Sequence, residues 1–336
     1  MLHFSGRAAP AQNSARAKGS NMHIKPDVHV TIATAQAIID RALPGRTVAA
    51  VSSIHGGDIA AVWEIALAAP EPAVVLKLYP DSLQWKMQKE VNVSTLIQGR
   101  LSVPMPRILF ADDTKALIDF NFVVMTKLEG SILRWLEPAL TPGQLASAYM
   151  QIGRLLREFH RIPMDAFGYI GPNGIWTAYA TNHAYMAFQF DKKLKEFIDQ
   201  GGAASLARQV AAHVAERNEL LHACTLPVLC HNDLHTTNLL AKTTEDAVCL
   251  SGVLDFEGAL AGDPLMDVAK ALYYVSEGNG RALLEGYGDT ARPQWSQSLS
   301  LYHLYFVLEL WCWMAQIGNR GALDQLTSDL ARFSAA

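Results

Sequence analysis

The sequence "VLCHNDLHTTNLL", residues 228–240, decides how the chain is interpreted. Apolar residues stand at both ends, and His231, Asp233 and Asn238 are gathered within eight residues between them. Asp and Asn alone are common in turns, because their side chains hydrogen-bond to the nearby backbone. A polar turn would therefore be a sufficient explanation if nothing further along the chain completed a chemical site.

A second carboxylate motif follows at a defined distance. The segment "VCLSGVLDFEG", residues 248–258, predicts a strand that ends at Asp255, seventeen residues after Asn238. Asp and Asn oxygens are hard ligands suited to Mg²⁺, and phosphoryl transfer requires mainly positioning and neutralisation of charge. A further carboxylate near the acceptor hydroxyl would orient it and accept its proton. Asp233, Asn238 and Asp255 together therefore favour a phosphoryl-transfer site over a turn.

The secondary-structure pattern changes near residue 130. Before it, after one helix at 30–43, apolar runs bounded by turn residues predict strands at 47–54, 60–67, 72–79, 103–113 and 120–126. One helix is expected among them at 82–99, with Ser82 as its N-cap and Gly99 beyond its end. After residue 130 the pattern predicts mainly helices, among them 141–162, 191–201, 205–224 and 263–275. The fold class expected is α+β with two lobes, and a ligand is expected between them.

Composition narrows the class of protein. Half of the 336 residues are hydrophobic, which is enough for a large core, and the net charge of -4 argues against nucleic acid as a partner. The four cysteines show no CxxC pair or zinc-ligand spacing, which favours reduced thiols in a cytoplasmic protein. No apolar run reaches the roughly 18 to 20 residues of a membrane span, so no membrane partner is expected.

The first 22 residues are treated separately. They are rich in Ala, Ser and Gly, carry Arg7, Arg16 and Lys18, and contain no acidic residue. They lack the apolar core of a secretory signal. We expect residues 1–22 to be a disordered or non-native extension, with a transit peptide as the alternative, and exclude them from the fold.

The motifs resemble those of a known superfamily. "HNDLHTTNLL" is similar to the HGDLHPGN pattern, and "VLDFEGALAGDPLMDVA", residues 253–269, resembles (I/V)DWE-x-A-x-x-GDPxxDLA, of the aminoglycoside phosphotransferase and choline kinase superfamily. The resemblance spans about residues 30–320 and implies a bilobal protein-kinase-like fold. It implies an N-terminal nucleotide-binding lobe at 23–128, a C-terminal catalytic and acceptor-binding lobe at 129–336, and ATP or GTP with Mg²⁺ as cofactors.

The resemblance also implies roles for individual residues. Asp233 would be the catalytic base, and Asn238 and Asp255 would hold Mg²⁺. His231 would be structural in the catalytic loop, and Asp267 would anchor that loop from the following helix.

In the N-terminal lobe, Lys77 is a single charge on an apolar strand, which is usually a surface residue whose amine reaches water. The resemblance implies instead that it neutralises the donor phosphates and pairs with Glu90, thirteen residues on. Gly56 and Gly57 would allow a loop to approach the phosphates closely, although the protein-kinase G-x-G-x-x-G pattern is absent.

Other roles follow from position alone. Met125 would lie behind the adenine, and the backbone of Thr126 and Leu128 would face the base. Glu257, Glu309 and Trp311 are candidates for contact with a cationic acceptor, because carboxylates and aromatic faces attract protonated amines. The alternative is that the aromatic residues around Trp311 pack a helix into the core.

The acceptor stays open at this stage. The resemblance implies a small hydroxyl-bearing acceptor, with an aminoglycoside-type phosphotransferase first and a choline-, ethanolamine- or sugar-amine-type kinase as the alternative. A nucleotide-binding pseudokinase is a second class. A protein kinase is disfavoured, because the segment "GDPLMDVA" follows Asp255 too closely for a long activation loop.

Overall fold

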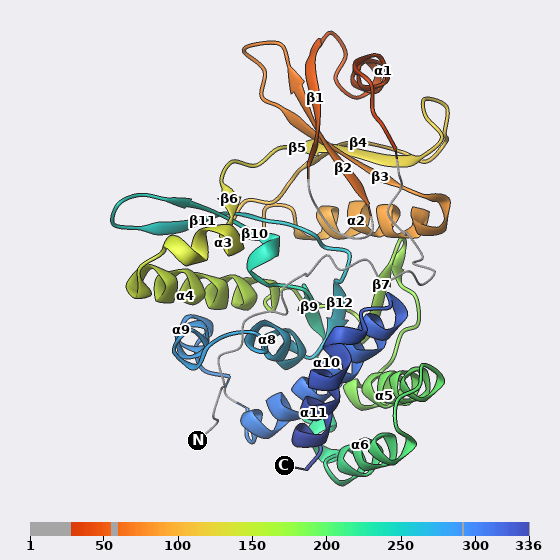
Figure 1. The fold of residues 1–336 in the computed structure, drawn as a ribbon, viewed down its shortest axis with the longest axis vertical. Helices are drawn as coiled ribbons and strands as arrows, with labels where there is room; N and C mark the ends of the chain where they lie inside the picture. Colours follow the sequence, from red (N-terminus) through yellow and green to blue (C-terminus); the bar gives the residue numbers. More distant parts are fainter. Residues whose placement is uncertain (1–27, 55–59, 291, 336) are drawn as a thin grey trace.

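The computed structural model describes residues 28–54, 60–290 and 292–335, and the chain forms an upper β-rich lobe and a lower helical lobe in Figure 1. The upper lobe contains a five-stranded antiparallel sheet in the order β1-β2-β3-β5-β4. Its strands are β1 (Val48–Ile54), β2 (Ala61–Leu67), β3 (Val74–Tyr79), β4 (Ile108–Asp112) and β5 (Asn121–Thr126). The predicted α+β class is confirmed.

The alternation of side chains along β3 decides which way Lys77 points. Leu76 and Leu78 are buried with residues of α1 (Ile32–Ala42) in one core cluster. Tyr79 belongs to a second cluster with Met87 of α2 (Gln84–Ile97). Because successive side chains of a strand point to opposite faces, Lys77 lies on the face of the sheet that α2 covers.

Two details of the N-terminal lobe differ from the prediction. Ser82 is not the N-cap of α2, because it lies inside a 3₁₀ turn at Asp81–Leu83, in which the Leu83 N–H donates to the Pro80 carbonyl. The predicted strand at 103–113 begins only at Ile108. Pro104 and Pro106 precede it, and proline has no N–H to donate to a neighbouring strand.

The second lobe is mainly helical and carries two small sheets, β11-β10-β6 and β8-β7-β12-β9. Its strands are β6 (Ser131–Ile132), β7 (Gly168–Gly171), β8 (Gly174–Ile175), β9 (Val228–Cys230), β10 (Leu239–Thr243), β11 (Val248–Val253) and β12 (Leu260–Gly262). Its helices are α3 (Leu133–Leu136), α4 (Pro142–Phe159), α5 (Asn182–Asp199), α6 (Ala204–Glu216), α7 (Glu219–His222), α8 (Pro264–Leu272), α9 (Glu277–Tyr287), α10 (Trp295–Gln316) and α11 (Leu323–Phe333).

Local capping signals explain some of these helix boundaries. Thr141 caps α4, with reciprocal hydrogen bonds between Thr141 and Gln144 and with Pro142 at the first position. The helix predicted at 191–201 begins earlier, at Asn182, after the cap Thr181. The helix predicted at 205–224 is divided into α6 and α7.

Among the helices of the described residues, none has the length and apolarity needed to cross a membrane.

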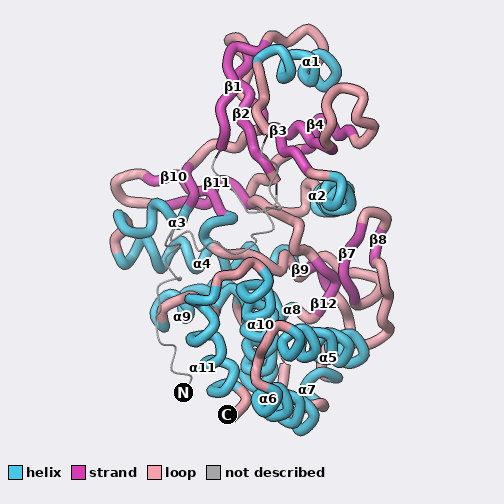
Figure 2. The backbone as a smooth tube through the Cα atoms, turned by 45° about the vertical axis from the view of Figure 1, so that its right-hand side comes forward, coloured by secondary structure: helices cyan, strands magenta, loops and turns pink. Residues whose placement is uncertain are grey.

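The lobes meet at α2, which lies between the five-stranded sheet and the second lobe in Figures 1 and 2. The Asn92 side chain of α2 donates to the Gly171 carbonyl of β7 at 3.0 Å. The Val253 N–H of β11 donates to the Pro104 carbonyl at 2.9 Å. The chain passes from one lobe to the other between β5 and β6, which belong to different sheets.

Helices α4 and α9 approach each other closely at glycines. A Cβ on Gly153 would lie 2.0 Å from the Leu283 carbonyl oxygen, and a Cβ on Gly286 would lie 2.0 Å from the Met150 carbonyl oxygen. The facing backbone atoms cannot move away from an added methyl group as a flexible side chain could. The two glycines therefore set the distance between these helices.

We predict that Gly153→Ala lowers the free energy of unfolding by about 3 kcal/mol, because the added methyl group forces α4 and α9 apart. Gly143→Ala is the matched control on the same helix, since a Cβ there meets nothing within 4 Å. Urea denaturation of both variants measures the difference. Equal stability of the two would show that the helix contact tolerates a methyl group.

Candidate active site

The hairpin formed by β10 and β11 brings the two predicted motifs together. Asn238 ends the loop that follows β9, and its amide nitrogen donates to the Asp233 carbonyl at 2.9 Å and to the Asp233 Oδ2 at 3.1 Å. The Leu254 N–H donates to the Asn238 carbonyl at 2.9 Å. Asp255 is the next residue after Leu254, so this hydrogen bond holds Asp255 beside the loop.

Asp267 makes the contact with the loop that the sequence predicts for it. Its buried carboxylate accepts hydrogen bonds from the backbone N–H groups of His231 and Asn232, at 2.7 and 2.8 Å. His160 lies 3.2 Å from the same carboxylate. Although burial opposes ionisation, the hydrogen bond and charge of His160 keep the pKa of Asp267 below its usual value. The loop is thus held by an ionised carboxylate.

His231 is fully buried, and its Nε2–H donates to the Leu254 carbonyl at 3.0 Å. Burial lowers the pKa of His231, so the ring is neutral at pH 7. Its position between the loop and the end of β11 fits the structural role expected from the sequence.

Two residues of the site have left-handed backbone conformations. Asn232 has φ 59° and Asp255 has φ 63°, a region that residues other than glycine rarely occupy and in which Asn and Asp are tolerated best. The Asn232 side chain also donates to the Gly258 carbonyl at 3.1 Å. Strained backbone of this kind is concentrated at functional sites.

Lys77 joins the two lobes electrostatically. Its amine lies 3.2 Å from Glu90 of α2, 2.9 Å from Glu257 and 4.0 Å from Asp255. Tyr79 donates a hydrogen bond to Glu90. Burial alone would lower the pKa of Lys77, but Glu257 and Glu90 hold that pKa well above its usual value. The amine is therefore charged, and the expected pair of Lys77 and Glu90 lies beside the C-terminal motif.

The carboxylates around Asp255 favour a cation. Burial raises the pKa of Asp255, and the nearby charges of Glu257 and Asp233 raise it further, although Lys77 opposes them. A divalent cation would relieve this repulsion. Asn238 donates through its amide nitrogen, so its amide oxygen is the atom that would bind a metal. The donor set of Asp255 and Asn238 fits Mg²⁺.

Asp233 is held by groups on both sides of its carboxylate. Oδ2 accepts from Asn238, while His235 lies 3.5 Å and Lys270 4.0 Å from Oδ1. Burial disfavours the charged form, but the hydrogen bond from His235 and the charge of Lys270 keep the pKa of Asp233 below its usual value. The carboxylate is therefore ionised and able to accept a hydrogen bond from a hydroxyl group.

The residues expected around adenine lie at the end of β5 and after it. Met125 is buried in the cluster that contains Tyr79. The Thr126 N–H donates to the Arg107 carbonyl at 3.0 Å, and Leu128 lies over Gly252, where a Cβ would approach its Cδ1 to 2.7 Å. Gly56 and Gly57 lie outside the described residues.

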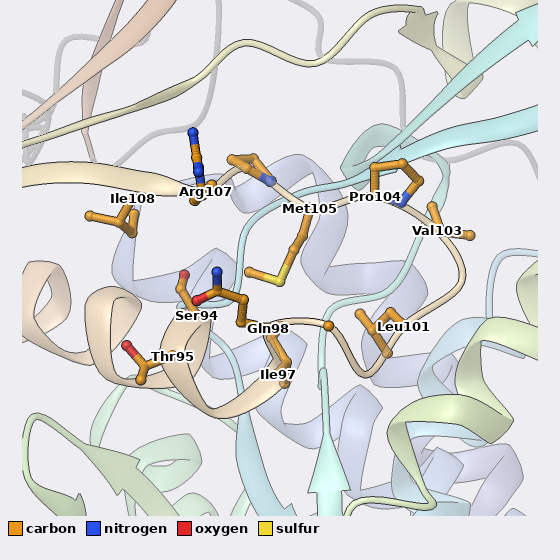
Figure 3. A pocket seen from close by; sticks show the side chains of 12 residues that line it. Ser94, Thr95, Ile97, Gln98, Leu101, Val103, Pro104, Met105, Arg107 and Ile108 are labelled. Atoms are coloured by element: carbon orange, nitrogen blue, oxygen red, sulfur yellow. The ribbon is translucent and has the colours of Figure 1, made fainter. Parts of the chain in front are cut away.

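A separate pocket lies between the end of α2 and the segment before β4 (Figure 3). Its wall includes Gln98, Leu101, Met105 and Arg107, and Figure 3 shows the Met105 side chain pointing toward α2. None of the residues predicted for the catalytic site lines it.

The structure corrects two of the acceptor predictions. Glu257 is buried between Lys77 and Lys86, which lie 2.9 and 3.3 Å from its carboxylate, so it faces cations of the protein itself. Trp311 is 4% exposed, donates to Thr327 at 3.0 Å and packs on Phe197. Trp311 belongs to the core, because α10 has buried residues on several of its sides.

Glu309 does lie close to the catalytic loop. It accepts a hydrogen bond at 3.3 Å from Lys270, which in turn approaches Asp233. Three further residues of the site were not predicted from the sequence: Lys270, His235 and Lys86. Lys270 could have been predicted from its spacing. It follows Asp267 by three residues, and side chains at that spacing share one face of a helix.

Lys89 is a second lysine of α2, and it is buried. It is fully buried, its amine lies 3.5 Å from the centre of the Tyr169 ring, and no hydrogen-bond partner for the amine is found among the described residues. Burial, and then the charge of Lys86, lower the pKa of Lys89 to about 6. The amine is therefore neutral at pH 7 and packs against β7.

We predict that Lys89→Met raises the free energy of unfolding at pH 7 by roughly 2 kcal/mol, because the wild-type amine must lose its proton to be buried. This penalty is greatest below pH 6 and fades as the pH approaches the unfolded-state pKa of lysine. The gain should therefore shrink by pH 10, as measured by denaturation at several pH values.

Lys192→Met, at an exposed position of α5, is the control and should change little at any pH. If Lys89→Met instead destabilised the protein throughout, the amine would have to be charged and paired.

Comparison with solved structures places the fold among kinase-like phosphotransferases. The structure of aminoglycoside phosphotransferase APH(4)-Ia superposes with a TM-score of 0.71 at 15% identity, over 91% of this chain and 99% of its own. A ternary complex of a thermostable mutant of that enzyme with ADP and hygromycin B gives 0.69 at 16% identity, over 89% and 97%. The GDP complex of wild-type aminoglycoside 2'-phosphotransferase-IIIa gives 0.66 at 17% identity, over 91% and 99%.

A family model supplies the assignment. The model of the phosphotransferase enzyme family matches residues 50–299, which is well over half of the chain. The chain belongs to this family, and it is a phosphotransferase. No curated protein sequence matches it.

Proposed function

We propose that the protein transfers the γ-phosphoryl group of ATP to a hydroxyl group of a small molecule, with Mg²⁺ as cofactor. The observation that carries this proposal is the junction of the lobes, where Lys77, paired with Glu90, lies 4.0 Å from Asp255. Phosphoryl transfer needs such a fixed cation beside a metal-binding carboxylate. Residues 23–128 would then hold the nucleotide, and residues 129–336 the metal and the acceptor.

In this proposal Asp233 accepts a hydrogen bond from the acceptor hydroxyl and takes its proton as the new oxygen–phosphorus bond forms. The bond from the γ-phosphorus to the bridging oxygen breaks, and the nucleoside diphosphate leaves. Lys77 neutralises the donor phosphates. Mg²⁺, when bound by Asn238 and Asp255, would neutralise the charge on the transferring group. The low pKa of Asp233 fits a base whose main task is orientation.

The relatives support a nucleotide and a small acceptor. One solved complex contains ADP with hygromycin B, another contains GDP, and a third relative is bound to gentamicin. We favour ATP and keep GTP as the alternative donor. The described cysteines are unpaired, which supports a cytoplasmic location.

We predict that Asp233→Asn lowers kcat by about 10³-fold, because the amide cannot accept the proton. Binding of ATP and Mg²⁺ should be nearly unchanged in isothermal titration calorimetry, since Asp233 is not assigned to the nucleotide. Asp246→Asn, at an exposed position between β10 and β11, is the matched control. Near-normal turnover by Asp233→Asn would remove its role as the base.

We also predict that Asp255→Ala weakens the dependence of ATP binding on Mg²⁺. The gain in affinity that Mg²⁺ gives should fall at least about tenfold, because a charged ligand of the metal is lost. Titration of ATP with and without Mg²⁺ measures this gain, and Asp246→Asn should keep it. An unchanged gain in Asp255→Ala would mean that the metal is held elsewhere.

The pseudokinase alternative makes a different prediction. A nucleotide-binding protein without catalysis would bind ATP but consume none with any acceptor. ATP consumption with aminoglycosides, macrolides, choline, ethanolamine and sugar amines distinguishes the two. The enzyme is favoured because the chain has the full set of expected site residues: Lys77, Glu90, Asp233, Asn238 and Asp255.

A further inference from the structure

Lys270 is a buried cation of the site to which the proposed chemistry gives no task. It lies on α8, its side chain is 16% exposed, and its amine lies 3.3 Å from Glu309 and 4.0 Å from Asp233. The amine also lies 5.0 Å from the centre of the Phe306 ring. Lys270 thus occupies the space between the proposed base and the nearest carboxylate of α10.

The position of this amine is fixed by the same helix that holds the loop. Asp267 binds the backbone of the loop, and Lys270 follows it by less than one turn of α8. Glu309 holds the amine from the side of α10. Burial lowers the pKa of Lys270, but Glu309 and Asp233 outweigh it and raise that pKa above its usual value. The group is a permanent positive charge.

The other carboxylates of the site are already compensated. Glu257 lies between Lys77 and Lys86, and Glu90 is paired with Lys77. Asp255 is assigned to the metal. On the acceptor side, Asp233 and Glu309 share the single charge of Lys270. Counted over the described lysines and carboxylates of these ion pairs, one negative charge is therefore left to attract an acceptor, and His235 also lies beside Asp233 at 3.5 Å.

We propose that Lys270 determines acceptor specificity: it restricts the acceptor to a hydroxyl compound that is neutral or carries a single positive charge, and it excludes polycations. The inference rests on the proposed function, because it assumes that the acceptor hydroxyl reaches Asp233. An ammonium group close to that hydroxyl meets the Lys270 ammonium, and like charges repel most strongly where water is excluded. The aminoglycoside-bound relatives share only 15–16% of their residues with this chain.

Removing the charge should create a site for polycations. In Lys270→Met, Asp233 and Glu309 both lose their lysine, so both carboxylates become more available to amines, although His235 stays 3.5 Å from Asp233. We expect the dissociation constant of kanamycin, measured by calorimetry with AMP-PNP and Mg²⁺ present, to fall at least about tenfold relative to the wild type. A loss of structure alone would weaken binding and could not produce this gain.

Three variants control the measurement. Lys270→Arg keeps the charge and should bind kanamycin as weakly as the wild type does. Glu309→Gln removes the carboxylate and keeps the lysine, so it should not improve binding. Lys193→Met removes a lysine of similar exposure, 19%, that is paired with Glu196 on α5, and it should have no effect. Equal affinity for kanamycin in Lys270→Met and the wild type overturns the proposal.

The wild-type enzyme gives a second test that needs no variant. Across the acceptor panel, ATP consumption should be greatest with compounds that carry at most one positive charge. If a polycationic aminoglycoside has the highest kcat/KM, Lys270 does not exclude polycations and the proposal is wrong. If no compound supports turnover, the proposed function fails instead, and the calorimetric comparison still judges Lys270 by itself.

Discussion

The ion cluster around Lys77 is the interaction on which the arrangement of the two lobes depends. A single buried ammonium on β3 contacts Glu90 of α2 and Glu257 of the second lobe. Removing one partner of a buried ion pair leaves an uncompensated charge, which is far more unfavourable than losing a surface pair. The cluster therefore fixes the position of α2 relative to the C-terminal motif, and with it the distance between Lys77 and Asp255.

The catalytic loop depends on a second buried charge, and here the sequence was most informative. The motif pattern placed Asp267 against the loop, and its carboxylate binds the backbone N–H groups of His231 and Asn232. The pattern also has glycine where this chain has Asn232. The φ of 59° explains why both residues are acceptable there, because glycine and asparagine are the residues that adopt the left-handed region most readily.

The two acceptor predictions that went wrong share a physical cause. Glu257 and Trp311 were placed from their distance along the chain to the motif or from their residue type. What they contact depends on packing between distant segments: Lys86 comes from α2, and Phe197 comes from α5. The N-cap prediction for α2 was wrong for a different, local reason, because the 3₁₀ turn after Pro80 shifts the start of the helix past Ser82. Periodicity predicts which face of an element is apolar, and it does not identify the partner that covers that face.

The same limitation applies to charge. Counting acidic residues near the motifs suggests a site that attracts amines, because Glu257 and Glu309 both fall within or near it. In the folded chain each of these carboxylates has a lysine within 3.3 Å. Electrostatic specificity depends on the charge that remains after such internal pairing. The proposed acceptor side of this site is therefore less negative than its composition suggests, because Lys270 offsets part of that charge.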